Sequence, residues 1–222
     1  MVKNMESREN RDFSRMFVTI TAIYVACLVL SNLVAGKMWA VSESITLPAA
    51  VILFPVTYIL GDIFTEVYGF KKASYIIWLG FFLSFFAVAV YMITIALPYP
   101  SFWENQQAYE TVLGTTPRVA AASFAGYLGG EFSNSLIMSK LKIATKGEKL
   151  WARTILSTVV GEGIDSVIFI TISFFGTMDN GTLLTMIVSQ YLFKVIYEVV
   201  FTPVTYAAVG FVKKKEALVA CD

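Results

Sequence analysis

Long runs of uncharged, mostly apolar residues constrain this chain more than any other feature of its sequence. Residues 16–36 carry no charge between Arg15 and Lys37, and the run from Ala73 to Leu97 carries none either. An α-helix rises about 1.5 Å per residue, so each run is long enough to cross the roughly 30 Å of hydrocarbon in a bilayer. The sequence therefore predicts a protein built from transmembrane helices.

Six segments have the length of a membrane crossing. The last three contain charged residues, which weakens their hydropathy, but glycines lie in the gaps between them where turns are needed. Pro55 lies inside the second segment and is expected to kink it. Residues 98–117 are expected to form an external loop with a short interfacial helix. The predicted fold is all-α, a polytopic bundle in one transport domain (13–212), with helices at about 13–36, 47–69, 72–97, 117–140, 152–176 and 182–212.

The basic residues predict the orientation of these helices, because cytoplasmic loops are enriched in Lys and Arg. Fourteen of the 17 basic residues fall on one side of the predicted bundle. They lie around the N-terminal tail (1–12), after the second helix, after the fourth helix and in the C-terminal tail (213–222). Both tails are therefore predicted to be cytoplasmic, in a multi-pass protein of the bacterial inner or plasma membrane.

The composition excludes several classes of function. The chain contains no histidine, so a His-based catalytic triad and a His-ligated metal site are both impossible. A net charge of +1 does not suggest a nucleic-acid-binding protein. The two cysteines, Cys27 and Cys221, are read as inert thiols. No phosphate-binding loop of the GxxxxGK[ST] type occurs, so this chain is not expected to hydrolyse ATP. We expect neither an enzyme nor a cofactor-binding protein.

Ionisable residues within the predicted helices indicate where function lies. Each costs about 2.5–3.5 kcal/mol on membrane-insertion scales, so such side chains usually face the bundle interior and mark a pathway or site. Glu162, Asp165 and Lys194 are predicted to lie near the bilayer midplane, with Gln190 and Tyr197 on the same helix face as Lys194. The full set is Asp62, Glu66, Arg118, Glu131, Glu162, Asp165, Lys194 and Glu198.

Some of these charges also fit structural roles. Asp62 and Glu66 could form an ion-pair cluster with Lys71 and Lys72 at a helix end. Arg118 could anchor the start of a helix at the membrane surface. Glu198 lies four residues after Lys194 and is read first as a structural partner. Glu162 and Asp165 differ, because two carboxylates on one helix face repel each other unless a cation, a proton or a donor-rich ligand lies between them. That pair favours a functional site.

Four sequence motifs, in the same order along the chain, resemble those of a known family. The blocks are FPVTYILGDIFTEVYGFKKA (54–73), RVAAASFAGYLGGEFSNSLIMSKLK (118–142), WARTILSTVVGEGIDSVIF (151–169) and YLFKVIYE (191–198). They resemble the bacterial queuosine precursor transporter family, which is also classed among vitamin uptake transporters. The resemblance implies a six-helix fold similar to the substrate-binding subunits of energy-coupling-factor importers. With the intramembrane chemistry, it implies a substrate-binding site containing Asn32, Asp62, Arg118, Tyr127, Glu131, Asn134, Glu162, Asp165 and Lys194.

The same resemblance implies import of queuine or 7-deazaguanines, such as the 7-cyano and 7-aminomethyl compounds, for salvage into tRNA queuosine. The N1–H and exocyclic amine of a 7-deazaguanine are adjacent donors that a carboxylate can accept together, and its carbonyl suits Lys194 or Asn134. The alternative is a substrate-binding subunit that needs a separate ATPase module. The sequence leaves open the preferred precursor, the energy source and the formation of a homodimer.

Overall fold

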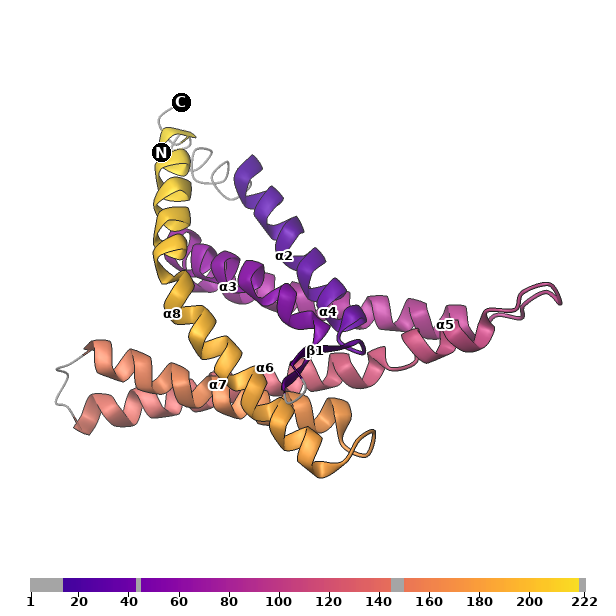
Figure 1. Cartoon of the computed structure of the whole chain (residues 1–222). Coiled ribbons are helices and arrows are strands. Elements are labelled where there is room, and N and C mark those ends of the chain that lie inside the picture. The colour runs from indigo at the N-terminus through magenta and orange to yellow at the C-terminus, as the bar shows by residue number, and fades with distance from the viewer. Residues whose placement is uncertain (1–13, 43–44, 145–149, 220–222) are drawn as a thin grey trace.

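The computed structural model describes residues 14–42, 45–144 and 150–219, and within them the fold is almost entirely helical (Figure 1). The predicted all-α class is confirmed. The predicted tail at residues 1–12 lies outside the described part, whereas the last helix continues through residues 213–219, which were predicted to be tail. The helices are α2 (Arg15–Val34), α3 (Phe54–Ile63), α4 (Phe70–Ala96), α5 (Gln106–Leu113), α6 (Thr116–Ala144), α7 (Leu150–Phe174) and α8 (Asn180–Val219).

Two of these helices begin at side-chain caps. The hydroxyl of Ser14 accepts a hydrogen bond of 3.0 Å from the backbone N–H of Phe17, at the start of α2. At the start of α8, Asp179 accepts one of 2.8 Å from the backbone N–H of Thr182 and one of 2.7 Å from its hydroxyl. These bonds stabilise the charged carboxylate and hold the pKa of Asp179 below its ordinary value.

The second predicted helix, 47–69, is replaced by a mixed segment. Pro48 ends a strand, and Pro55 lies in the first turn of α3, where proline is tolerated, so the predicted kink at Pro55 is wrong. The antiparallel hairpin that precedes α3 was not predicted. The segment comprises strands β1 (Met38–Ser42) and β2 (Ile45–Pro48), the 3-10 turn η2 (Ala49–Ile52), α3 itself and the π-helical turn η3 (Phe64–Tyr68).

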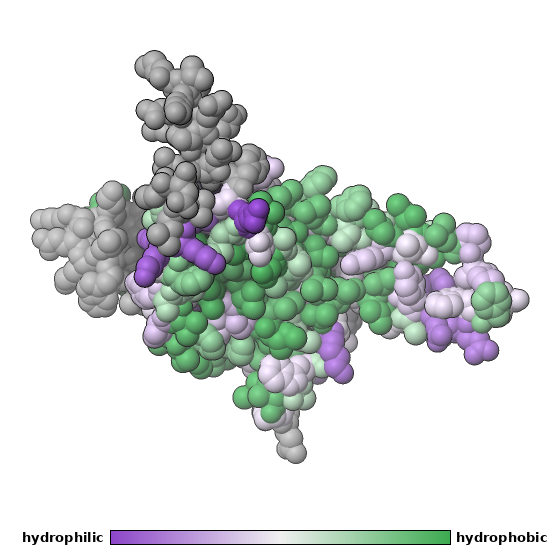
Figure 2. Space-filling model, turned by 90° about the horizontal axis from the view of Figure 1, so that it is seen from above, coloured by the Kyte–Doolittle hydropathy of each residue, from purple (hydrophilic) through white to green (hydrophobic). Residues whose placement is uncertain are grey.

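Among the described residues, four helices are long and apolar enough to cross a membrane: α2, α4, the part of α7 from Leu156, and most of α8. The fourth predicted crossing corresponds to α6, which is long enough at 29 residues but carries several charges. The second predicted crossing, 47–69, is divided into the shorter elements described above. The second and fourth crossings therefore stay predictions. Figure 2 shows apolar residues covering most of the visible face, as expected for a surface in contact with lipid.

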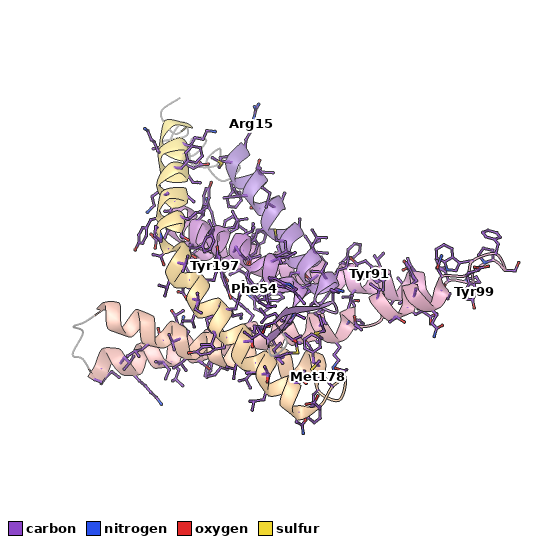
Figure 3. All side chains as sticks on the ribbon, in the orientation of Figure 1. Arg15, Phe54, Tyr91, Tyr99, Met178 and Tyr197 are labelled. Carbon is purple, nitrogen blue, oxygen red and sulfur yellow. The ribbon has the colours of Figure 1, made fainter. Side chains whose placement is uncertain are left out.

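Buried apolar residues form two separate cores, one toward each end of α8. The first packs the N-terminal part of α2 with α3, η3 and α4 against Val209 and Val212 of α8. The second packs the end of α2, η2, α6 and α7 against Leu183 and Met186. Lys194 therefore lies on α8 between the two cores. In Figure 3, Phe54 and Tyr197 mark this middle region, with Arg15 and Met178 toward opposite ends.

The two ends of the described chain meet beside the first core. The hydroxyl of Ser14 donates to Oε1 of Glu216 at 2.7 Å, and the hydroxyl of Tyr68 donates to the same oxygen at 2.9 Å. The start of α2, the end of η3 and the end of α8 are thus joined by one carboxylate. We call this end of the molecule the terminal end.

Candidate functional site

Four polar side chains from three helices converge between the two cores. Lys194 of α8 pairs with Glu162 of α7 at 3.0 Å and also with Asp165 of α7. The hydroxyl of Tyr58, from α3, donates to Oε2 of Glu162 at 3.3 Å. We call Tyr58, Glu162, Asp165 and Lys194 the Lys194 cluster. These contacts bring together Glu162, Asp165 and Lys194, three of the predicted site residues, and their role in binding stays a prediction.

The Lys194 cluster is enclosed and carries a net negative charge. The Lys194 side chain is 5% exposed, and those of Glu162 and Asp165 are 23% and 22% exposed. The Lys194 ammonium also lies 5.4 Å from the centre of the Phe54 ring, which adds a cation–π contact. One ammonium balances only one of the two carboxylates. An uncompensated charge in a low-dielectric region is unfavourable, so this cluster is suited to bind a donor-rich or cationic partner.

A seam of glycines lets α6 and α7 approach closely and places Asp165. A Cβ atom added at Gly126 would lie 2.6 Å from Oδ1 of Asp165, and one added at Gly130 would lie 3.0 Å from its Cβ. The Asp165 side chain therefore packs directly against the backbone of α6. Small residues spaced by four positions are the usual means of close helix packing in membranes. The seam holds Asp165 toward α8, where Lys194 pairs with it.

We predict that filling this seam destabilises the protein. Gly161→Ala would place a Cβ atom 2.9 Å from the backbone oxygen of Gly130 and 3.1 Å from the Cβ of Asn134. The helices would have to separate, at a cost of about 1–3 kcal/mol. Thermal unfolding of the purified variant in detergent should show a clearly lowered midpoint. Gly210→Ala is the matched control, since an added Cβ there meets nothing within 4 Å. Equal unfolding midpoints for the two variants would contradict the claim that close packing at the glycine seam stabilises the protein.

Two further buried polar groups flank Lys194 on α8. Gln190 is 1% exposed and Tyr197 is 7% exposed. Oε1 of Gln190 and the hydroxyl of Tyr197 have no hydrogen-bond partner among the protein groups. The Tyr197 ring lies 6.1 Å from that of Tyr58, centre to centre, which places it beside the Lys194 cluster. Buried polar atoms without a partner are expected to bind water or a ligand.

The other predicted site residues are distributed over several places. Asn32 on α2 accepts a hydrogen bond of 2.7 Å from Ser123 on α6, so it joins those two helices. The Tyr127 ring packs 5.3 Å from that of Phe81 on α4. Asn134 faces α7 at Gly161, and its Oδ1 is buried without a partner. These three residues lie along α6, at its contacts with α2, α4 and α7.

Three predicted site residues are exposed. Arg118 donates to the backbone oxygen of Ile172, and at 2.6 Å to that of Phe175, so it caps the end of α7. Asp62 and Glu131 are also exposed, on α3 and α6 respectively. Glu66, which was predicted with Asp62 to join an ion-pair cluster with Lys71 and Lys72, pairs with Lys213 at 3.5 Å. Contacts of Arg118, Asp62 and Glu131 with substrate stay predictions.

Sequence reasoning did not select two aromatic residues that contact the cluster, Tyr58 and Phe54. Both lie in the first motif block, and Tyr58 precedes Asp62 by four residues, so the two share a helix face. This four-residue spacing from Asp62 was the sequence signal that could have identified Tyr58 as a site residue. Among the described residues, no group of three or more acidic or cysteine side chains is arranged to hold a metal ion. The cluster's carboxylates, ammonium and aromatic rings are suited instead to a planar hydrogen-bonding ligand.

Comparison with known proteins agrees with the sequence motifs. Residues 48–208 match a family model described as "Putative vitamin uptake transporter". A protein of Bacillus subtilis (strain 168), "Probable queuosine precursor transporter", is 27% identical over 167 residues, which cover 74% of this chain and 72% of that protein. No solved structure matches the chain. The family match and the apolar helices of the chain together identify a multi-pass transport protein of the cell membrane. The chain belongs to the vitamin uptake transporter family.

Proposed function

We propose that this protein imports 7-deazaguanine precursors of queuosine, including queuine and the 7-cyano and 7-aminomethyl compounds, for salvage into tRNA. The observation that carries the proposal is the Lys194 cluster, a mixed-charge site on apolar helices in the middle of the molecule. The Bacillus subtilis relative is named a probable queuosine precursor transporter, and this name supports the same substrate class. Family membership points away from an enzyme.

The chemistry of the Lys194 cluster matches the hydrogen-bonding edge of a guanine-like base. In our proposal Asp165 or Glu162 accepts from the adjacent N1–H and exocyclic amine, and Lys194 donates to the carbonyl. The substrate's donors then take the place of the Lys194 ammonium on one carboxylate. The rings of Phe54 and Tyr58, 6.0 Å apart between centres, offer faces on which the base can stack. Gln190 and Tyr197 supply further polar contacts.

We also propose that six helices cross the membrane and that both termini are cytoplasmic. The bonds from Ser14 and Tyr68 to Glu216 support this arrangement, because they bring the start of α2 and the end of α8 to the same end of the molecule. The concentration of basic residues at that side of the predicted bundle supports a cytoplasmic location.

Competition for uptake tests the proposed substrate class. Adenine presents an acceptor where guanine presents N1–H, so it would leave buried charged groups unpaired at about 1–3 kcal/mol for each group. In cells that carry only this transporter, 7-cyano-7-deazaguanine should therefore inhibit uptake of labelled 7-deazaguanine about 10- to 100-fold more strongly than adenine. Guanine, which has the same edge, should inhibit measurably. Equal inhibition by adenine and the cyano compound would contradict the proposed edge recognition.

A further inference from the structure

The Lys194 cluster is one positive charge short of neutrality. Glu162 and Asp165 contribute two carboxylates, and Lys194 contributes one ammonium. The neutral state of this group contains one carboxylate, one carboxylic acid and one ammonium, and therefore holds one additional proton. Close carboxylates favour binding such a proton, since both cannot be ionised without repulsion. Chains of carboxylates inside transporters commonly carry protons for this reason.

Further carboxylates continue from the cluster toward the terminal end. Glu198 lies one helical turn beyond Lys194 on α8, and Asp62 lies one turn beyond Tyr58 on α3, which packs against α8. Charge repulsion at Glu198 from Glu162 and Asp62 agrees with this placement. Asp62 interacts in turn with Glu66, which pairs with Lys213 at 3.5 Å. Tyr58, Asp62 and Glu66 follow each other at intervals of four residues. The acidic groups thus form a line that starts at Glu162 and leads along α3 and α8.

An independent observation indicates that water or a ligand reaches the start of this line. The Tyr197 hydroxyl, next to Glu198 in sequence, and Oε1 of Gln190 are buried without a protein partner. The next two members of the line, Glu198 and Asp62, are exposed. Charged side chains at such positions in a membrane protein line aqueous paths. Polar groups that can bind water therefore accompany the carboxylates of the line.

We propose that uptake is coupled to protons, with the Lys194 cluster binding one proton per substrate and Glu198 carrying it away toward the terminal end. This inference rests on the proposed transport function. In the transfer step, the O–H bond of protonated Glu162 breaks and an O–H bond forms on Glu198, directly or through water. Glu162 returns to a carboxylate that is paired with Lys194. The proton then passes to Asp62 in the same way, and no other co-reactant is needed.

Charged groups on three helices surround Glu198. Lys194 lies on the same helix, and the carboxylates of Glu162 and Asp62 face Glu198 from the packed helices α7 and α3. Beyond Asp62, Glu66 is balanced by Lys213. Asp62 lies between Tyr58 of α3 and Glu66 of η3, so a proton that passes from Glu198 to Asp62 moves away from the Lys194 cluster toward the terminal end.

Proteoliposomes that contain the purified protein provide the test. The probe is labelled 7-cyano-7-deazaguanine, a neutral compound, with the membrane potential held at zero by potassium and valinomycin. An external medium one pH unit more acidic than the interior should drive about tenfold accumulation for one proton per substrate. Exchange of internal for external substrate at equal pH measures transport without a gradient. A sodium gradient at equal pH should give no accumulation.

Variants separate coupling from transport. Glu198→Gln should exchange substrate at close to the normal rate but lose the tenfold accumulation, whereas Glu198→Asp keeps a carboxylate and should retain it. Glu104→Gln, at an exposed carboxylate in the connection before α5, should behave as the unmodified protein. Normal exchange with no response to the pH gradient would overturn the coupling, and full accumulation by Glu198→Gln would overturn the role of Glu198. Absence of exchange in the unmodified protein would overturn the transport function itself, and the coupling with it.

Discussion

Replacing Asp165 with Asn should lower the affinity for substrate, and uptake at low substrate concentration, about 10- to 100-fold. The change keeps the side-chain volume but replaces one accepting oxygen with a donating NH₂ group. A hydrogen bond to a charged group contributes about 1.5–3 kcal/mol, and the variant loses such a bond to the substrate and weakens the pairing with Lys194. The contact with Gly126 leaves the side chain little space to turn away. Initial rates of uptake, normalised to the amount of inserted protein, measure the effect.

The matched control for this variant is Asp179→Asn. Asp179 is an exposed residue that caps α8 through Thr182, and Asn caps helices as well as Asp does. The control should therefore take up substrate at the normal rate. If Asp165→Asn inserts normally and also transports at that rate, Asp165 is not a binding determinant.

Replacing Lys194 with Met should cause the largest loss of stability of any substitution considered. Removal of one partner from a buried ion pair costs about 3–5 kcal/mol, because the remaining charges lose their compensation. For a chain of this size, that corresponds to a fall of roughly 6–20 °C in the unfolding midpoint. Adding Glu162→Gln to the same protein should restore part of the loss, since only the Asp165 carboxylate then remains uncompensated. Thermal unfolding of the single and double variants in one detergent measures both effects.

Lys213→Met is the control for the Lys194 variant. Lys213 pairs with Glu66 at 3.5 Å, but these side chains are 51% and 63% exposed, and exposed ion pairs contribute little. Its unfolding midpoint should stay close to that of the unmodified protein. A similar midpoint for Lys194→Met, or a further fall on adding Glu162→Gln, would contradict the charge balance described for the cluster.

Hydropathy and helical spacing predicted the long helices well. The ends of α4 and α7 fall within two residues of the predicted limits, because charged residues, prolines and glycines mark the boundaries of the apolar runs. The segment from residue 38 to residue 68 was not predictable in the same way. Its long uncharged run, residues 45–61, is interrupted by Pro48 and Pro55, and periodicity alone does not distinguish a short strand from a piece of buried helix. The hairpin of β1 and β2 and the divided helix around α3 were therefore missed.

The candidate site was predictable where one helix face carried the signal. Glu162 and Asp165 are three residues apart on α7, and their mutual repulsion indicated a cation, a proton or a donor-rich ligand between them. The pairing of these carboxylates with Lys194 of α8 was not predicted. Contacts that depend on how helices pack carry no such signal. The bond from Ser123 to Asn32 and the capping of α7 by Arg118 require knowledge of which helix surfaces meet. Tyr58 was missed for the same reason.

The most direct test of the central claim, that the Lys194 cluster binds the substrate, is an experimental structure of the protein with 7-cyano-7-deazaguanine bound. We predict that the base lies between α3, α7 and α8, with its N1–H and exocyclic amine within hydrogen-bond distance of Asp165 or Glu162. Its carbonyl should accept from Lys194, and its ring should pack against Phe54 or Tyr58. A base bound instead between α2 and α6, beside Asn32 and Ser123 and with the contacts of Lys194 unchanged, would contradict the account.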